Sequence, residues 1–144
     1  MSNPAPKAYL DQISPYVGGK AKVQGAQRII KLSSNENPNG PCPAAMNAFA
    51  QSASTLHRYP EDGCASLREA IAGHFHVAAD QIICGAGSDE VLGMLVHTFA
   101  GVGDEVLYPE HGFLMYGIYA QQFGATPVAA PEQNLRTDVD ALLD

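Results

Sequence analysis

The sequence has little of what several classes of protein need. It contains no tryptophan and only three cysteines, Cys42, Cys64 and Cys84, an odd number without a CxxC spacing. This usage disfavours a disulfide framework and a zinc site, and it fits a reducing, cytoplasmic compartment. The five histidines show no spacing typical of metal ligands, so we predict no metal site.

Positive charge and long apolar runs are also scarce. Eight Lys and Arg stand against fifteen Asp and Glu, which gives a formal net charge of −7. A nucleic-acid surface needs clustered basic residues that release counterions. The only dense group here is Lys20, Lys22, Arg28 and Lys31. No apolar run reaches the length of a bilayer span, and the opening MSNPAPKAYLDQ lacks a signal-peptide core. We therefore expect neither nucleic acid nor membrane as a partner.

What the chain does contain is a strand–turn–helix pattern between Ile82 and Phe99. The apolar run Ile82–Cys84 predicts a short buried strand, and Gly85-Ala86-Gly87 predicts a sharp turn. Ser88 then predicts a helix cap, with Asp89 and Glu90 in the positively polarised first turn. Free N–H groups and the helix dipole at such a start favour a bound anion, most often phosphate.

This pattern excludes two common phosphate motifs. A dinucleotide fingerprint needs a third glycine where Glu90 stands, and a Walker loop needs a lysine that the segment lacks. A plain strand-to-helix connection with a serine cap explains the same residues without any ligand. From this stretch alone both readings stay open.

Strand and helix patterns alternate from about residue 82 onward. This alternation predicts an α/β fold with a mainly parallel sheet flanked by helices, whose ligands lie beyond the carboxyl ends of the strands. The expected elements after the phosphate turn are a strand at Glu105–Tyr108, a helix at Phe113–Phe123 capped by Gly124, a strand at Thr126–Ala130 and a helix from Val139.

The sequence before residue 82 predicts two helices and an irregular N-terminal arm. The helices are expected at Ala44–Ala53, with Met46 and Phe49 facing inward, and at Ser66–His76, with Leu67, Ile71 and Phe75 on one face. Upstream we expect a single turn at Tyr9–Ile13 and a short strand at Ile29–Leu32.

Two polar loops in the first forty residues have alternative readings. The Tyr16–Lys20 loop joins an aromatic residue, two glycines and a lysine, so it suits an anionic ligand or a partner subunit, but also a plain surface arm. The asparagines of the Ser33–Pro41 loop are explained by turn chemistry or by a hydrogen-bonding rim over a polar ligand.

Four motifs occur together in a familiar order. They are KLSSNENPNGP (31–41), RYPEDG (58–63), GAGSDEVL (85–92) and YPEHGFLMY (108–116), and SPYVGGK (14–20) precedes them. Together they resemble the N-terminal portion of histidinol-phosphate aminotransferases, which are pyridoxal-phosphate enzymes of the aspartate-aminotransferase fold (fold type I). The resemblance runs from about Ser14 to the last residue.

The resemblance implies a role for each matching residue. The cofactor phosphate would lie on Gly87, Ser88 and Asp89, and the ring of Phe113 would stack on the pyridine ring. Tyr59 matches a tyrosine that reaches the cofactor phosphate of the neighbouring subunit. The substrate-binding positions would be Tyr16, near the partner's substrate site, and Asn35, in the pocket. Such shared sites imply a homodimer.

The implied reaction is amino transfer between histidinol phosphate and 2-oxoglutarate, which gives glutamate, with pyridoxal 5′-phosphate as cofactor. In the family the lysine that forms the aldimine lies far downstream of the phosphate turn. The four lysines here, Lys7, Lys20, Lys22 and Lys31, all precede that turn. We therefore name no catalytic residue, and we expect a partial protein that is inactive alone.

The resemblance also predicts a division of the chain. Residues 1–40 would form an N-terminal arm and a small-domain segment, and residues 41–144 the first part of the large cofactor-binding domain. The alternatives are another enzyme of the same fold, such as an aromatic aminotransferase or a threonine-phosphate decarboxylase, or a non-catalytic fragment that binds only cofactor or a partner subunit. A generic phosphate-binding α/β module would leave the other three motifs unexplained.

Overall fold

The computed structural model describes residues 5–18, 24–25, 30–32 and 34–143. The fold is a mixed α/β arrangement with short helices and two small sheets. Its elements are η1 (Ala8–Gln12), α1 (Pro43–Ser52), η2 (Ala53–Thr55), η3 (Asp62–Cys64), α2 (Ala65–Phe75), η4 (Ala79–Gln81), α3 (Gly87–Phe99), β1 (Glu105–Pro109), α4 (Met115–Phe123), β2 (Thr126–Ala130), β3 (Glu132–Gln133), β4 (Arg136–Thr137) and α5 (Val139–Leu143).

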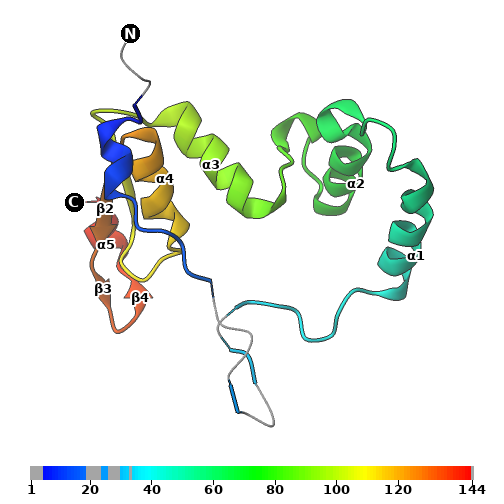
Figure 1. The fold of residues 1–144 in the computed structure, drawn as a ribbon, viewed down its shortest axis with the longest axis horizontal. Helices are drawn as coiled ribbons and strands as arrows, with labels where there is room; N and C mark the ends of the chain where they lie inside the picture. Colours follow the sequence, from blue (N-terminus) through cyan, green and yellow to red (C-terminus); the bar gives the residue numbers. More distant parts are fainter. Residues whose placement is uncertain (1–4, 19–23, 26–29, 33, 144) are drawn as a thin grey trace.

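The elements follow one another along an open arc (Figure 1). The strands, α4 and η1 lie together at one end, α3 leads from there toward α2, and α1 lies at the other end. The α3 helix thus lies between α2 and the end that contains α4 and the strands.

Among the described residues no helix combines the length and the apolar character that crossing a bilayer requires.

The β1–α4–β2 unit confirms the predicted alternation. The two strands pair in parallel from Glu105 opposite Thr126 to Pro109 opposite Ala130. The connecting helix α4 packs against both strands, as a parallel crossover requires. It ends at Gly124, whose φ of 85° is left-handed and whose N–H donates to the Gln121 carbonyl at 3.1 Å, so the predicted glycine cap is confirmed.

Two predicted strands do not form in the described residues. Residues Ile82–Cys84 are irregular, and Ile83 is 64% exposed. A strand needs a hydrogen-bonding neighbour, and in the described chain β1 pairs only with β2. Residues 30–32 are likewise irregular, while Ile29 lies outside the described residues.

Several predicted helix details are also wrong. The α3 helix has its N-cap at Ala86 rather than at Ser88, and α4 starts at Met115 rather than at Phe113. Met46 and Phe49, predicted to face inward, are more than half exposed. Leu67 and Phe75, on the predicted apolar face of α2, are more than half exposed as well. Periodicity identifies an apolar face but not whether another element covers it, and α1 packs mainly on the short η2 that follows it.

The buried apolar core is small and lies around α4. Among the described residues it consists of Ala120, Ala125 and Ala130. Large apolar side chains elsewhere stay in solvent, including Leu32, Phe99 and Val102, each at least 78% exposed. Since burial of such side chains is the main source of folding free energy, the stable part of this structure is the α3–β1–α4–β2 region.

Helices α3 and α4 meet where α3 has no side chain. A Cβ placed on Gly93 would lie 2.9 Å from Cε1 and 3.1 Å from Cζ of Tyr119, so the tyrosine ring rests directly on the α3 backbone. Phe123 extends the contact by stacking on His97 with ring centroids 4.4 Å apart. The absence of a side chain at Gly93 therefore sets the distance between the two helices.

The start of α2 depends on a carboxylate. One oxygen of Glu61, Oε2, accepts the Ser66 backbone N–H at 3.0 Å and the Ser66 hydroxyl at 2.6 Å. These two hydrogen bonds, the hydroxyl one first, lower the pKa of Glu61 below its usual value. The ionised carboxylate of Glu61, two residues after Tyr59, thus anchors the first turn of α2.

We predict that Gly93→Ala destabilises the protein. In an open helix position this change gains roughly 0.5–1 kcal/mol, but here the methyl group would strike the Tyr119 ring, and such overpacking costs about 1–3 kcal/mol. The midpoint of urea unfolding, followed by circular dichroism, should fall. The matched control is Gly73→Ala in α2, where nothing lies within 4 Å of the added Cβ, and it should raise the midpoint. Equal shifts for the two variants would contradict the contact.

We predict that the anchor of α2 weakens in acid. The pKa of Glu61 is lowered in the folded state, so its stabilisation is complete above the unfolded value, about 4.3, and is lost as the pH falls through the folded pKa. A carbon-13 NMR titration of the Glu61 carboxyl should give a low midpoint that rises in Ser66→Ala. Ser54→Ala, whose hydroxyl bonds Gln51, should leave that midpoint unchanged. An unaltered midpoint in Ser66→Ala would refute the anchor.

Candidate functional site

The turn before α3 is held by short local hydrogen bonds. The Ala86 N–H donates to Oε2 of Glu90 at 2.6 Å, and the Gly87 N–H donates to the Gly85 carbonyl at 2.8 Å. Gly87 has a φ of 84°, a left-handed conformation that favours glycine. The Gly87 N–H is therefore already used, which leaves Ser88 and Asp89 as the polar residues of the predicted anion site.

The two acidic residues of this turn point toward α4. The pKa of Tyr119 is raised, first by burial, then by a hydrogen bond to the Asp89 side chain and by the charges of Asp89 and Glu90. Glu90 also lines a separate surface depression with Gly93 and Tyr119. Both negative charges thus lie close enough to act on Tyr119 of α4.

The start of α3 also borders a pocket of about 570 Å³. Gly87 and Ser88 line this pocket from α3, and Phe113 lines it from the loop after β1. The Ser88 hydroxyl donates no hydrogen bond to any described residue. The remaining lining residues are Leu67, Ile71, Ile83, Cys84, Gly85, Val91, Leu92 and Tyr116.

Phe113 is supported by its neighbours in the loop and in α4. Its ring meets the Tyr116 ring edge to face with centroids 6.0 Å apart. At Gly112, a Cβ would come within 2.8 Å of the Pro109 carbonyl oxygen, so this loop position has no room for a side chain. Phe113 remains 44% exposed, which leaves one face of its ring accessible.

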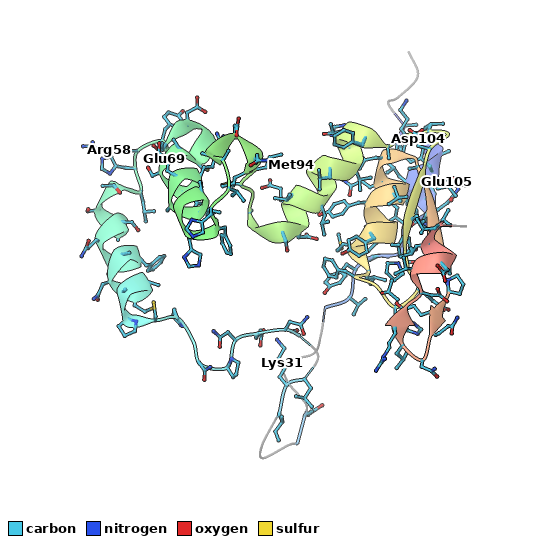
Figure 2. The ribbon with its side chains drawn as sticks, turned by 180° about the vertical axis from the view of Figure 1, so that it is seen from behind. Lys31, Arg58, Glu69, Met94, Asp104 and Glu105 are labelled. Carbon is cyan, nitrogen blue, oxygen red and sulfur yellow. The ribbon has the colours of Figure 1, made fainter. Side chains whose placement is uncertain are left out.

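The structure brings three of the seven predicted site residues to this pocket. These are Gly87, Ser88 and Phe113, whereas Asp89 is beside them in α3 but does not line the pocket. Tyr59, Tyr16 and Asn35 are exposed and are not among the lining residues; the Tyr59 side chain is 100% exposed. Figure 2 shows Arg58, the neighbour of Tyr59, near the α1 end of the arc, away from Asp104 and Glu105 near the sheet.

Sequence reasoning missed the apolar wall of the pocket. Leu67 and Ile71 come from α2, and Tyr116 comes from α4. The four-residue spacing of Leu67 and Ile71 was a usable signal, because such residues share one helix face. The apolar face of an amphipathic helix normally packs against the core. Here the face that carries Leu67 and Ile71 borders an open pocket.

The arrangement combines two kinds of surface. Apolar and aromatic side chains form the wall, and the Ser88 hydroxyl lies at a helix start where the dipole favours an anion. These features suit a planar aromatic molecule that carries an anionic group. No lysine is among the lining residues in the described part of the chain.

Comparison with known proteins shows that the chain is similar in sequence to histidinol-phosphate aminotransferases. No protein-family model matches it. It is 54% identical over 143 residues to histidinol-phosphate aminotransferase from Paramagnetospirillum magneticum, covering 99% of this chain and 39% of that protein. The histidinol-phosphate aminotransferase from a Ruegeria species is 53% identical over 143 residues, and the match covers 99% of this chain and 40% of that protein.

A solved structure agrees with the sequence relatives. The crystal structure of histidinol-phosphate aminotransferase from Sinorhizobium meliloti in complex with pyridoxal-5′-phosphate matches with a TM-score of 0.73 and 27% identity. The match covers 76% of this chain and 30% of that one. The chain thus spans about two-fifths of the length of the curated relatives it matches. Along its own length, the protein is homologous to a portion of histidinol-phosphate aminotransferase.

Proposed function

We propose that this chain forms the phosphate-binding and ring-stacking part of a pyridoxal-phosphate aminotransferase site. The complete site would transfer an amino group between histidinol phosphate and 2-oxoglutarate in histidine biosynthesis. The observation that carries the proposal is that Gly87, Ser88 and Phe113 line one pocket. The 54% identity to a histidinol-phosphate aminotransferase supports this choice of substrates.

The proposed roles follow from the surroundings of each residue. The Ser88 hydroxyl would donate to the cofactor phosphate, together with backbone N–H groups near the start of α3. Asp89 would contribute through its backbone, because its carboxylate faces Tyr119. Phe113 would cover one face of the pyridine ring and exclude water from it. When bound, the cofactor supplies an electron sink for chemistry at the amino-bearing carbon.

We also propose a more specific fold, a domain division and a homodimer. Residues 41–144 would form the first part of the large domain of a fold-type I aminotransferase, and residues 1–40 an N-terminal arm with a small-domain segment. Full exposure of Tyr59 and the half-exposed Tyr16 suit residues that act at a neighbouring subunit, so we propose a homodimer. Asn35, also exposed, would line the substrate pocket. A cytoplasmic location fits the free cysteines.

The pocket as described can bind a cofactor but lacks the amine that the family's chemistry uses. All lysines in the sequence precede Leu32, and none lines the pocket. We therefore expect the purified chain to give no glutamate from histidinol phosphate and 2-oxoglutarate in a coupled assay. Turnover by this chain, free of any longer aminotransferase, would refute that expectation.

We predict that pyridoxal phosphate binds the chain through Ser88 and Phe113. Loss of a hydrogen bond to a charged group costs about 1.5–3 kcal/mol, so Ser88→Ala should raise the Kd at least about tenfold. Phe113→Leu, which removes the aromatic face, should weaken binding by roughly threefold to tenfold. The Kd is measured by the change in cofactor absorbance on titration.

Two matched variants serve as controls for that titration. Ser54→Ala removes a hydroxyl that bonds only within its own segment, and Phe99→Leu shortens a 78% exposed side chain at the far end of α3. Neither should change the Kd. Pyridoxal without its phosphate should be insensitive to Ser88→Ala. Equal losses in the site variants and the controls would contradict the proposed site.

A further inference from the structure

The side chain of Glu132 in β3 is almost completely buried. It is 6% exposed and lies 3.0 Å, through Oε2, from Nδ1 of His111, which is itself 56% exposed. A carboxylate removed from water requires a hydrogen-bonding or charged partner. Among the described residues, the Glu132 side chain makes no other hydrogen bond or ion pair. The Glu132 carboxylate is therefore held inside the structure by a residue of the loop after β1.

The contact continues the pairing of the two parallel strands. Their last paired residues are Pro109 and Ala130, and the Glu110 N–H still donates to the Ala130 carbonyl at 2.9 Å. His111 and Glu132 each lie two residues further along. Their side chains thus tie together two segments that have already left the sheet.

The tied loop is the one that carries Phe113. It turns tightly, because the Gly112 N–H donates to the Pro109 carbonyl at 2.7 Å. Phe113 follows His111 by two residues, and its own carbonyl accepts the Tyr116 N–H at 3.0 Å near the start of α4. The loop is fixed at both ends by backbone hydrogen bonds, and the His111–Glu132 contact links its middle to a neighbouring segment.

We propose that His111 and Glu132 are positioning residues that hold the Phe113 loop in place. Glu132 fixes His111, and His111 fixes the turn that directs the Phe113 ring into the pocket with Gly87 and Ser88. The value of this arrangement for cofactor binding rests on the function proposed above. The ordering of the loop does not, because it is a property of the chain without ligand.

The test measures loop order and cofactor binding separately. Amide hydrogen exchange at Gly112 and at Tyr116, whose N–H groups donate to the Pro109 and Phe113 carbonyls, reports the loop in the absence of ligand. Glu132→Ala should speed this exchange about tenfold, as expected when a hydrogen bond to a charged group is lost. Glu132→Gln keeps an oxygen acceptor and should restore most of the protection. The matched control is Glu110→Ala, which removes an exposed carboxylate of the same loop and should have no effect.

A second variant covers the case in which Glu132→Ala does not fold. His111→Ala removes the exposed partner instead. Protection at Thr126, whose N–H donates to the Asp104 carbonyl at 2.9 Å, and at Val128 in the paired strand would show that the sheet is intact. Unchanged exchange at Gly112 and Tyr116 in both variants would overturn the proposal, as would equal losses throughout the sheet.

Titration with pyridoxal phosphate then separates this proposal from the function. We expect a threefold to tenfold higher Kd in Glu132→Ala and recovery in Glu132→Gln. Faster loop exchange in a chain that binds no pyridoxal phosphate even when unmodified would support the positioning role and reject the proposed function. Faster exchange with an unchanged Kd would show that the loop position is irrelevant to binding. It would overturn the proposal that His111 and Glu132 position Phe113 for the cofactor.

Discussion

The packing of Tyr119 on the bare backbone at Gly93 is the contact on which the rest of the site depends. It fixes α3 against α4, and α4 in turn packs on β1 and β2. Gly87 and Ser88 stand at the start of α3, and Phe113 stands just before α4, so this one contact sets how the two sides of the pocket face each other. The closely spaced backbones also explain why the buried core around α4 consists of alanines.

The same contact gives the start of α3 two chemically different sides. Asp89 and Glu90 raise the pKa of Tyr119 in α4, and the Glu90 carboxylate accepts the Ala86 N–H of the turn before α3. On the pocket side, the Ser88 hydroxyl and apolar walls remain. Two carboxylates in the first turn would repel a phosphate if they faced it. Neither Asp89 nor Glu90 is among the residues that line the pocket, and the dipole of α3 supports an anion at its start.

The elements whose stability is local were predictable from the sequence, and those that need a distant neighbour were not. The Thr126–Ala130 strand and the Gly124 cap follow from alternation and from glycine's access to a left-handed backbone. The expected strand at Ile82–Cys84 has no neighbour to pair with in the described chain. In the candidate site, motifs predicted the Gly87–Ser88 turn and Phe113, which line one pocket. The Leu67–Ile71 wall and the His111–Glu132 link join segments far apart in sequence, which periodicity does not reveal.

The measurement that tests the central claim most directly is an NMR titration of the chain with pyridoxal phosphate. If the α3–α4 contact assembles one site, the backbone amides of Ser88 and Asp89 and the ring protons of Phe113 should shift together and fit a single Kd. The Phe49 and Phe99 signals should stay in place, because both side chains are exposed outside the pocket. Shifts confined to one side of the pocket, or spread over the exposed apolar surface, would contradict the account.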